Sequence, residues 1–393
     1  MQYRESPKSG EKLSALGYGC MRFTKKGGAI DQEKAEKELA LAVERGVNYF
    51  DTAYIYPGSE AALGKFLKKY GCRDQINIAT KLPQYYIKKP GDAEKYFAEE
   101  LERLQTDHVD YYLMHMLNDP ATWERLCGLG IKEWIEEKKA SGKIRRIGFS
   151  FHGGTVKFKA LLDAYDWDFC QVQFNYLDEN SQAGIEGVRR AREKGIPVII
   201  MEPLRGGRLA DGLPEKAKKE FAKADPERSP AEWGLRWLWN HEEVTVVLSG
   251  MNDTAQVEEN TRIASEAMPG DLGSEEMEVY DRVLRILNEQ VRVGCTGCGY
   301  CQPCPKGVDI PGCFAAYNHS YTDSYANGFR EYFMCTTLRG VRTNAGLCVK
   351  CGKCEQHCPQ GLPIRKELEN VRRRLENPVY KIGAAGVKLV MKY

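Results

Sequence analysis

The sequence has almost no net charge and no long hydrophobic run. Its 57 basic residues nearly balance its 55 acidic residues, which leaves a formal net charge of +2 at pH 7. This balance gives the protein no general electrostatic attraction to nucleic acid or to anionic lipid. No apolar stretch approaches the roughly 18 residues that a membrane span needs, and the amino-terminal segment is polar. We therefore expect a cytoplasmic protein without nucleic-acid or membrane partners.

Cysteine is scarce over most of the chain and abundant near its end. Four of the 14 cysteines lie in the first 294 residues, and the other ten lie between Cys295 and Cys358. In a long chain without a signal peptide, such a cluster favours metal ligation over disulfide bonds. The break in composition also predicts two domains, residues 1–285 and 286–393, because 393 residues exceed the about 250 of a single barrel of strand-helix units.

The first domain lacks the Gly-x-Gly-x-x-Gly turn that often follows the first strand of an open, doubly wound sheet. From Leu13 to about residue 265, short apolar runs instead alternate eight times with amphipathic segments. This rhythm predicts an α/β fold, a closed (β/α)8 TIM barrel. Residues 121–140 are predicted to form one helix. The long segment 204–228 is interpreted either as a lid over the site or as a solvated excursion.

Four side chains stand at or just after the ends of predicted strands. The run VNYFDTAYIY contains Asp51 and Tyr56, and the next two strands end at Lys81 and His115. Parallel barrel strands gather such groups at one rim. Tyr56 is of the right type to protonate a carbonyl oxygen, and Lys81 would lower the pKa of its phenol. Asp51 would keep Lys81 charged, and His115 would orient the substrate.

The first domain resembles the aldo-keto reductases, a family of barrels that use a nicotinamide coenzyme. The resemblance is carried by NYFDTAYIYPGSEAALGK, ATK, LMH, IGFS, QVQFN, MEPLRGG and VEEN, within residues 10–265. It implies that Tyr56 is the general acid, that Asp51 and Lys81 tune it, and that His115 orients a small carbonyl substrate. Hydride would pass from NAD(P)H to the carbonyl carbon.

The same resemblance implies a set of coenzyme contacts. They are Met21, Ser150, Gln171, Met201, Pro203, Leu204, Gly206, Ser249, Gly250, Gln256, Glu259 and Asn260. An aromatic residue is common in relatives where this chain has Met201. Cations that often hold the 2'-phosphate of NADP are replaced by Gly250 and Gln256, so a preference for NADP over NAD is expected to be weak or reversed. Arg205 and Arg208 are alternative sources of positive charge.

The second domain contains two runs of four cysteines, CTGCGYCQPCP and CVKCGKCEQHCP. They resemble the motifs of bacterial ferredoxins with two 4Fe-4S clusters. Zinc is the alternative metal that such thiols could bind. The resemblance implies a small α-rich ferredoxin-like domain in which ligation crosses between the runs. One cluster would be held by Cys295, Cys298, Cys301 and Cys358, and the other by Cys348, Cys351, Cys354 and Cys304.

The insert between the two runs is rich in aromatic residues and is predicted to pack as helix against the barrel. Its Cys313 and Cys335 are interpreted as ordinary buried thiols. Together the two domains predict an oxidoreductase that reduces aldehydes or ketones and carries iron-sulfur clusters. One alternative is electron transfer from a barrel-bound substrate or flavin to a redox partner protein through the clusters. Another is a redox or oxygen sensor with vestigial catalysis, against which the complete set of four rim residues argues.

Overall fold

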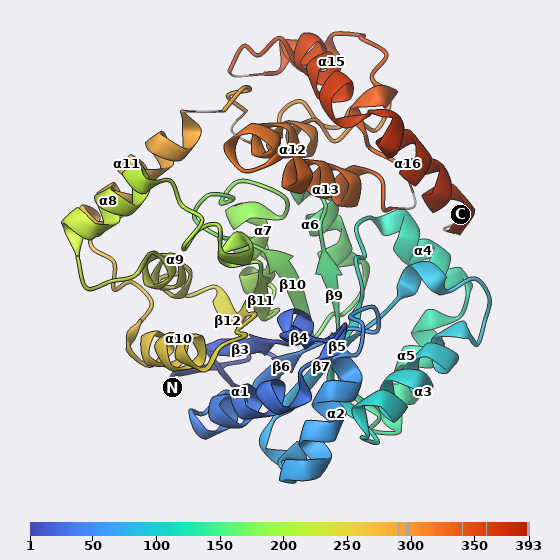
Figure 1. The fold of residues 1–393 in the computed structure, drawn as a ribbon. Helices are drawn as coiled ribbons and strands as arrows, with labels where there is room; N and C mark the ends of the chain where they lie inside the picture. Colours follow the sequence, from blue (N-terminus) through green and yellow to red (C-terminus); the bar gives the residue numbers. More distant parts are fainter. Residues whose placement is uncertain (290, 296, 298, 340, 359, 391–393) are drawn as a thin grey trace.

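The first part of the chain forms the predicted closed parallel barrel (Figure 1). The structure is a computed structural model that describes residues 1–289, 291–295, 297, 299–339, 341–358 and 360–390. The barrel strands are β3 (Leu16–Gly19), β6 (Tyr49–Asp51), β7 (Asn77–Leu82), β8 (Val109–Met114), β9 (Ile144–Phe151), β10 (Phe169–Gln173), β11 (Val198–Met201) and β12 (Val244–Ser249). Successive strands are neighbours around the barrel, and β12 pairs with β3 to close it.

Helices surround the strands and bury their apolar faces against them (Figure 1). They are α1 (Gln32–Glu44), α2 (Ser59–Tyr70), α3 (Asp92–Leu104), α4 (Pro120–Gly128), α5 (Ile131–Ala140), α6 (Thr155–Ala164), α7 (Gly184–Glu193), α8 (Glu215–Ala224), α9 (Pro230–Trp239), α10 (Thr254–Glu266) and α11 (Ser274–Asn288). Local sequence starts several of them. Asp31 caps α1 by accepting from Lys34 N, and Ser229 caps α9 with Pro230 at the first helical position.

The barrel interior is filled by side chains, several of them aromatic. The rings of Tyr49 and Tyr111 lie 5.1 Å apart, and those of Tyr111 and Phe169 lie 5.0 Å apart. An antiparallel hairpin, β1 (Tyr3–Glu5) and β2 (Lys12–Ser14), precedes the first barrel strand. Glu11 of its turn accepts a 2.6 Å hydrogen bond from the Tyr111 hydroxyl. The amino-terminal end of the barrel is therefore plugged, and the opposite rim is left for chemistry.

Two expectations from the sequence are corrected by the structure. The single helix over residues 121–140 is divided into α4 and α5 at Gly130, which has φ +82°, a conformation that glycine adopts readily. Residues 204–228 are not a solvated excursion, and the lid interpretation stays a prediction. Within this segment α8 packs on α11, and its Phe221 ring stacks 5.1 Å from the Trp233 ring at an interplanar angle of 16°.

The C-terminal region is α-rich and has an apolar core of its own. Its helices are α12 (Ile310–Thr322), α13 (Tyr325–Thr336), α14 (Lys353–Gln356), α15 (Ile364–Leu375) and α16 (Pro378–Val390). As predicted for the insert, α12 and α13 are helical and lie against the barrel near β9 and β10 (Figure 1). The boundary at residues 285 and 286 falls inside α11. Within the described ranges, no helix combines the length and apolar character that crossing a membrane requires.

Candidate active site and cysteine cavities

Four predicted side chains meet at the carboxyl-terminal rim of the barrel. Asp51 ends β6, Tyr56 follows in the next turn, Lys81 lies in β7 and His115 directly follows β8. The Lys81 ammonium lies 2.6 Å from Asp51 Oδ1 and 5.1 Å from the centroid of the Tyr56 ring. The rings of Tyr56 and His115 are 6.2 Å apart. The fold therefore places an acid, an amine, a phenol and an imidazole around one point.

The ion pair between Asp51 and Lys81 is buried but fully hydrogen-bonded. Lys81 is 1% exposed and also donates to the carbonyl of Thr52 at 2.6 Å. The second carboxylate oxygen of Asp51 accepts from Gln171 Nε2 at 2.8 Å. Burial alone would lower the pKa of Lys81, but Asp51 and Tyr56 favour the ammonium and the net direction is upward. Lys81 is thus a fixed positive charge beside the phenol.

Burial raises the pKa of the Tyr56 phenol, while Lys81 lowers it and Asp51 raises it further. The predicted effect of Lys81 is present, but it does not set the net direction. Removing a phenolate from water costs more here than one neighbouring ammonium recovers. Tyr56 therefore carries its proton at neutral pH.

His115 is buried and neutral. Burial, followed by the nearby charges of Lys81 and His152, holds the pKa of His115 well below its usual value. Its Nδ1 atom is buried and has no hydrogen-bond partner in the described part of the chain. His152 was not predicted from the sequence. It directly follows β9, just as His115 directly follows β8, so its position at a strand end could have indicated it. Its ring lies 3.2 Å from Gln182 Oε1.

The predicted coenzyme positions form an arc on the same rim. Ser150, Gln171, Met201 and Ser249 lie on β9 to β12, four consecutive strands, and Ser150 is the register partner of Gln171. Pro203, Leu204 and Gly206 follow β11, and Gly250 follows β12. Met21 lies after β3 and is 49% exposed. The fold brings these segments to one side of the four rim residues.

Several of these side chains already have protein partners. Ser150 Oγ accepts from Met116 N at 2.8 Å, and Gln256 Oε1 accepts from Asn252 N at 3.1 Å. In α10, Asn260 donates to Ser249 Oγ at 3.1 Å, and Glu259 accepts from Ser229 Oγ at 2.5 Å. These bonds fix the loops after β8 and β12, so the arc is built before any ligand enters.

The cysteines line two cavities in the C-terminal region. Cys304 shares a cavity of about 180 Å³ with Cys348, Cys351 and Cys354, which come from the second run. A smaller cavity is lined by Cys295, Cys301 and Cys358. Cys301 also borders the first cavity, and Cys298 lies outside the described residues. Each cavity thus brings together thiols from both runs.

These thiols fit a cluster better than a single ion. Within the described ranges, no three histidine, cysteine, aspartate or glutamate side chains are placed to hold one metal ion. A cube of four iron atoms spaces its thiolates more widely than one zinc ion does, and sulfur donors are its usual ligands. Cys313 and Cys335 line neither of these two cavities, and burial raises the pKa of both thiols.

Four charged side chains, here called the domain latch, join the C-terminal region to the barrel rim. They are Asp178 and Arg205 of the barrel, His319 of α12 and Glu331 of α13. Arg205 Nε lies 2.9 Å from Asp178 Oδ2, and its Nη2 lies 3.1 Å from Glu331 Oε2. Arg205 also contacts His319 Nδ1 at 2.6 Å, and the same nitrogen meets Glu331.

The latch holds His319 in its charged form. Burial and Arg205 oppose the imidazolium, but Glu331 and Asp178 outweigh them and raise the pKa of His319 to about 9. Nearby, Arg208 pairs with Asp323, and Arg339 donates to the carbonyl of His152 at 2.9 Å. Sequence reasoning missed the latch because no local motif marks it. The sequence suggested Arg205 and Arg208 as alternative ligands of a phosphate. In the structure both form ion pairs with acids of the C-terminal region.

A large cavity of about 740 Å³ lies between the barrel and the C-terminal region. Its barrel side includes His152 and Gln182, and its far side includes Cys295 and Cys304. Apolar side chains such as Leu287 and Val308 form part of the wall. The loops after β9 and β10 and the first cysteine run therefore border one space, which none of the four rim residues lines.

Comparison with known proteins assigns both regions. The sequence profile described as the Aldo/keto reductase family matches residues 15–272. The chain belongs to the aldo/keto reductase family. A second profile, described as a 4Fe-4S dicluster domain, matches residues 294–362. This member of the family thus joins an oxidoreductase barrel to an iron-sulfur domain, and the zinc alternative is set aside.

Relatives share the barrel at modest identity. L-galactose dehydrogenase of Arabidopsis thaliana is 28% identical over 290 residues, which are 68% of this chain and 89% of that protein. The holo form of aldo-keto reductase AKR11C1 from Bacillus halodurans has a TM-score of 0.59 and 27% identity, covering 72% of this chain and 96% of its own. An aldo-keto reductase from Klebsiella pneumoniae in complex with NADPH has a TM-score of 0.59, 24% identity and coverages of 72% and 95%.

Proposed function

We propose that the protein reduces a small aldehyde or ketone with a nicotinamide coenzyme, and that Tyr56 is the proton donor. The observation that carries this proposal is the meeting of Tyr56, Lys81 and His115 around one point at the open rim. The 4Fe-4S domain is the second functional part of the same chain. A redox partner protein that exchanges electrons with it is part of the proposal.

The protein residues divide the work as follows. When bound, the coenzyme supplies the hydride that forms the new C–H bond at the carbonyl carbon. The neutral imidazole of His115 hydrogen-bonds the carbonyl oxygen, and its lowered pKa and its place beside the Tyr56 ring support such a role. Tyr56 then transfers its phenolic proton to the developing alkoxide. Ser150, Gln171 and the loop from Pro203 to Gly206 would hold the coenzyme in the arc beside them.

The raised pKa of Tyr56 suits a donor that must keep its proton until the alkoxide forms. A buried phenol stays neutral in the resting enzyme. Once it has given up the proton, the phenolate faces the fixed ammonium of Lys81. That ammonium stabilises charge that develops only during the reaction, which is the kind of interaction that lowers a barrier.

We further propose that cluster ligation crosses between the cysteine runs. The sharing of one cavity by Cys304, Cys348, Cys351 and Cys354 supports one half of the arrangement. The sharing of the other by Cys295, Cys301 and Cys358 supports the second half, to which Cys298 would add the fourth thiolate. When bound, the clusters supply single-electron transfer.

The acid assignment is tested by comparing Tyr56→Phe with Tyr54→Phe. Tyr54 lies in the same turn, but its hydroxyl donates to Glu99 at 2.7 Å, away from the rim. The Tyr56 change should reduce coenzyme-dependent carbonyl reduction by about 100- to 10,000-fold with little effect on coenzyme binding. Tyr54→Phe should retain most activity. Retention of more than a third of wild-type turnover by Tyr56→Phe would refute the assignment.

Electron transfer between the barrel and the clusters is a second candidate, favoured by the 740 Å³ cavity that borders both His152 and Cys295. A nicotinamide gives two electrons as hydride, whereas each cluster accepts one, so a flavin or a similar carrier would have to bind there. The test is addition of reduced coenzyme to anaerobically purified protein. Bleaching of the cluster absorbance would support this candidate, and unchanged absorbance during carbonyl turnover would exclude it.

A further inference from the structure

Two arginines from different domains face one cavity at the barrel rim, and neither is neutralised. The cavity has a volume of about 260 Å³ and reaches from His152 and Gln173 to Arg22 and Arg330. Arg22 follows β3, and Arg330 belongs to α13 of the iron-sulfur domain. Both are exposed, and within the described residues no acidic side chain pairs with either of them.

The position of Arg22 depends on two glycines. A Cβ atom added to Gly206 would lie 2.6 Å from Arg22 Nη2, and one added to Gly250 would lie 2.9 Å from Arg22 Cδ. Any side chain at these positions would displace the arginine. Gly206 also has φ +69°, which disfavours other residues. Arg22 therefore lies across the loops that follow β11 and β12, with its guanidinium over the start of the first loop.

The other arginines around this cavity are already paired with acids. Arg205 is bound by Asp178 and Glu331, and Arg208 is paired with Asp323. Glu202 also lines the cavity, and its charge contributes to the raised pKa of the Tyr56 phenol. Arg22 and Arg330 are thus the cations left to bind a ligand, and two guanidinium groups facing one space suit a phosphate, whose oxygens accept several charge-assisted hydrogen bonds.

We propose that Arg22 and Arg330 form a phosphate-binding site to which the barrel and the iron-sulfur domain each contribute one residue. The ligand is a phosphate-bearing anion, and the diphosphate of the nicotinamide coenzyme fits the position between the loops after β11 and β12. That identification rests on the proposed function, whereas the anion site itself does not. The iron-sulfur domain would then take part directly in ligand binding by the barrel.

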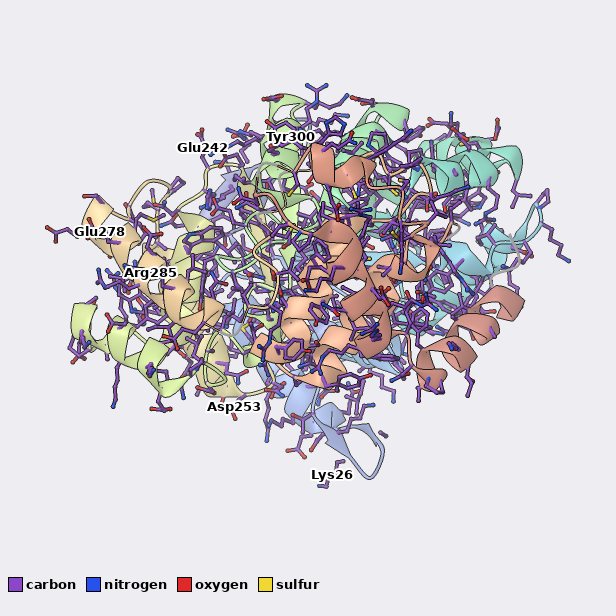
Figure 2. All side chains as sticks on the ribbon, turned by 90° about the horizontal axis from the view of Figure 1, so that it is seen from above. Lys26, Glu242, Asp253, Glu278, Arg285 and Tyr300 are labelled. Carbon is purple, nitrogen blue, oxygen red and sulfur yellow. The ribbon has the colours of Figure 1, made fainter. Side chains whose placement is uncertain are left out.

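The test measures binding by the full-length protein with its clusters intact. Arg22→Gln and Arg330→Gln are compared with Lys26→Gln and Arg372→Gln, which remove exposed cations from the same two parts of the chain without lining the cavity. Figure 2 shows Lys26 on a hairpin that projects away from the body of the molecule. NADH, NADPH and inorganic pyrophosphate are titrated against each variant, with retained cluster absorbance as the check on folding.

Each arginine variant should bind pyrophosphate about tenfold to a hundredfold more weakly than wild type, and the two controls should bind normally. Equal weakening for NADH and NADPH identifies the coenzyme diphosphate, and weakening for NADPH alone identifies its 2'-phosphate. Weakening for pyrophosphate alone, with coenzyme binding unchanged, assigns the site to a phosphorylated substrate.

A protein that binds pyrophosphate through these arginines but binds no coenzyme would refute the proposed function and leave the site standing. Normal pyrophosphate and coenzyme binding by Arg22→Gln would refute the phosphate-binding site. Normal binding by Arg330→Gln would refute the contribution of the iron-sulfur domain to it.

Discussion

The barrel rim and the cysteine cavities hold their reactive groups in different ways. At the rim, Asp51 and Lys81 lie at the ends of hydrogen-bonded strands, and each has protein partners for its charge. In the C-terminal region, the cysteines lie mostly on turns between short helices. Cys295, Cys304 and Cys348 pack at the edge of the apolar core there. The charges at the rim are thus paired within the protein, whereas the cysteines line cavities formed by turns from both runs.

Because of this difference, we expect substitutions at the two sites to have different effects on activity and on folding. The barrel has an extensive buried core that is independent of its site, so a change at the rim should remove chemistry before it removes the fold. The C-terminal region has a smaller core, and the thiols proposed to hold the clusters are part of its packing. Ligand binding is then also folding free energy, as it is in small metal-binding domains. The predictions below test this contrast.

The largest effect is expected from Cys358→Ser. If ligation crosses, the loss of this thiolate disturbs one cluster directly and the second through the shared fold. We expect the absorbance of both clusters to be lost and the C-terminal region to become sensitive to protease. Cys335→Ser is the matched control, because that buried thiol lines neither cluster cavity. A stable remaining cluster ligated by Cys295 to Cys304 alone would show that ligation does not cross.

A large effect confined to the barrel is expected from Lys81→Met. The change leaves Asp51 buried without its partner, which typically costs about 3–5 kcal/mol of unfolding free energy. Lys37→Met removes an exposed pair with Glu33 on α1 and should cost much less, because water screens such a pair. All six tryptophans lie in the barrel, so their fluorescence during urea unfolding reports on this domain. Equal losses in the two variants would contradict the importance of the buried pair.

A smaller, pH-dependent effect is expected at the domain latch. The folded-state pKa of His319 is raised to about 9. Its contribution is therefore fully present below the unfolded-state value near 6.5 and is lost as pH rises through 9. The stability of the C-terminal region, followed by cluster absorbance during urea unfolding, should fall by about 1–3 kcal/mol between pH 7 and pH 10.

The latch assignment has its own control. His319→Gln should remove most of this fall, because the amide does not titrate. His108→Gln should preserve it, because His108 precedes β8 at the opposite end of the barrel. A pH profile that is the same in all three proteins would show that His319 does not carry the effect.

The smallest effect concerns the choice of coenzyme. Gly250 and Gln256 offer no positive charge to a 2'-phosphate, and Arg205 and Arg208 are bound by acids. We expect NADH and NADPH to bind within about tenfold of each other, because Arg22, which lies against Gly250, is assigned to the diphosphate that both coenzymes share. Titration that shows NADPH bound a hundredfold more tightly would contradict this prediction.

Much of the rim could be predicted because its residues follow a local rule. Asp51, Lys81 and His115 each stand at or just after the end of an apolar run, and parallel barrel strands bring such ends together. The latch follows no such rule, since Asp178, Arg205, His319 and Glu331 come from four separate segments. The same holds for Arg22 and Arg330, which sequence reasoning did not consider. Their meeting depends on how α13 packs on the barrel rim.

The sequence by itself determined which chemistry is available: a phenol beside an amine, thiols in two runs, and a barrel to carry them. Residue types and short-range spacing suffice for this, because strand period, helix caps and ligand type are local properties. Only the tertiary structure decided the state of each group. It buried Tyr56 so that its pKa rises despite Lys81, and it gave Arg205 to Asp178 and Glu331 while leaving Arg22 and Arg330 to a ligand. Burial and charge pairing depend on neighbours that are distant in the chain, so the electrostatics of the site are fixed only when the chain has folded.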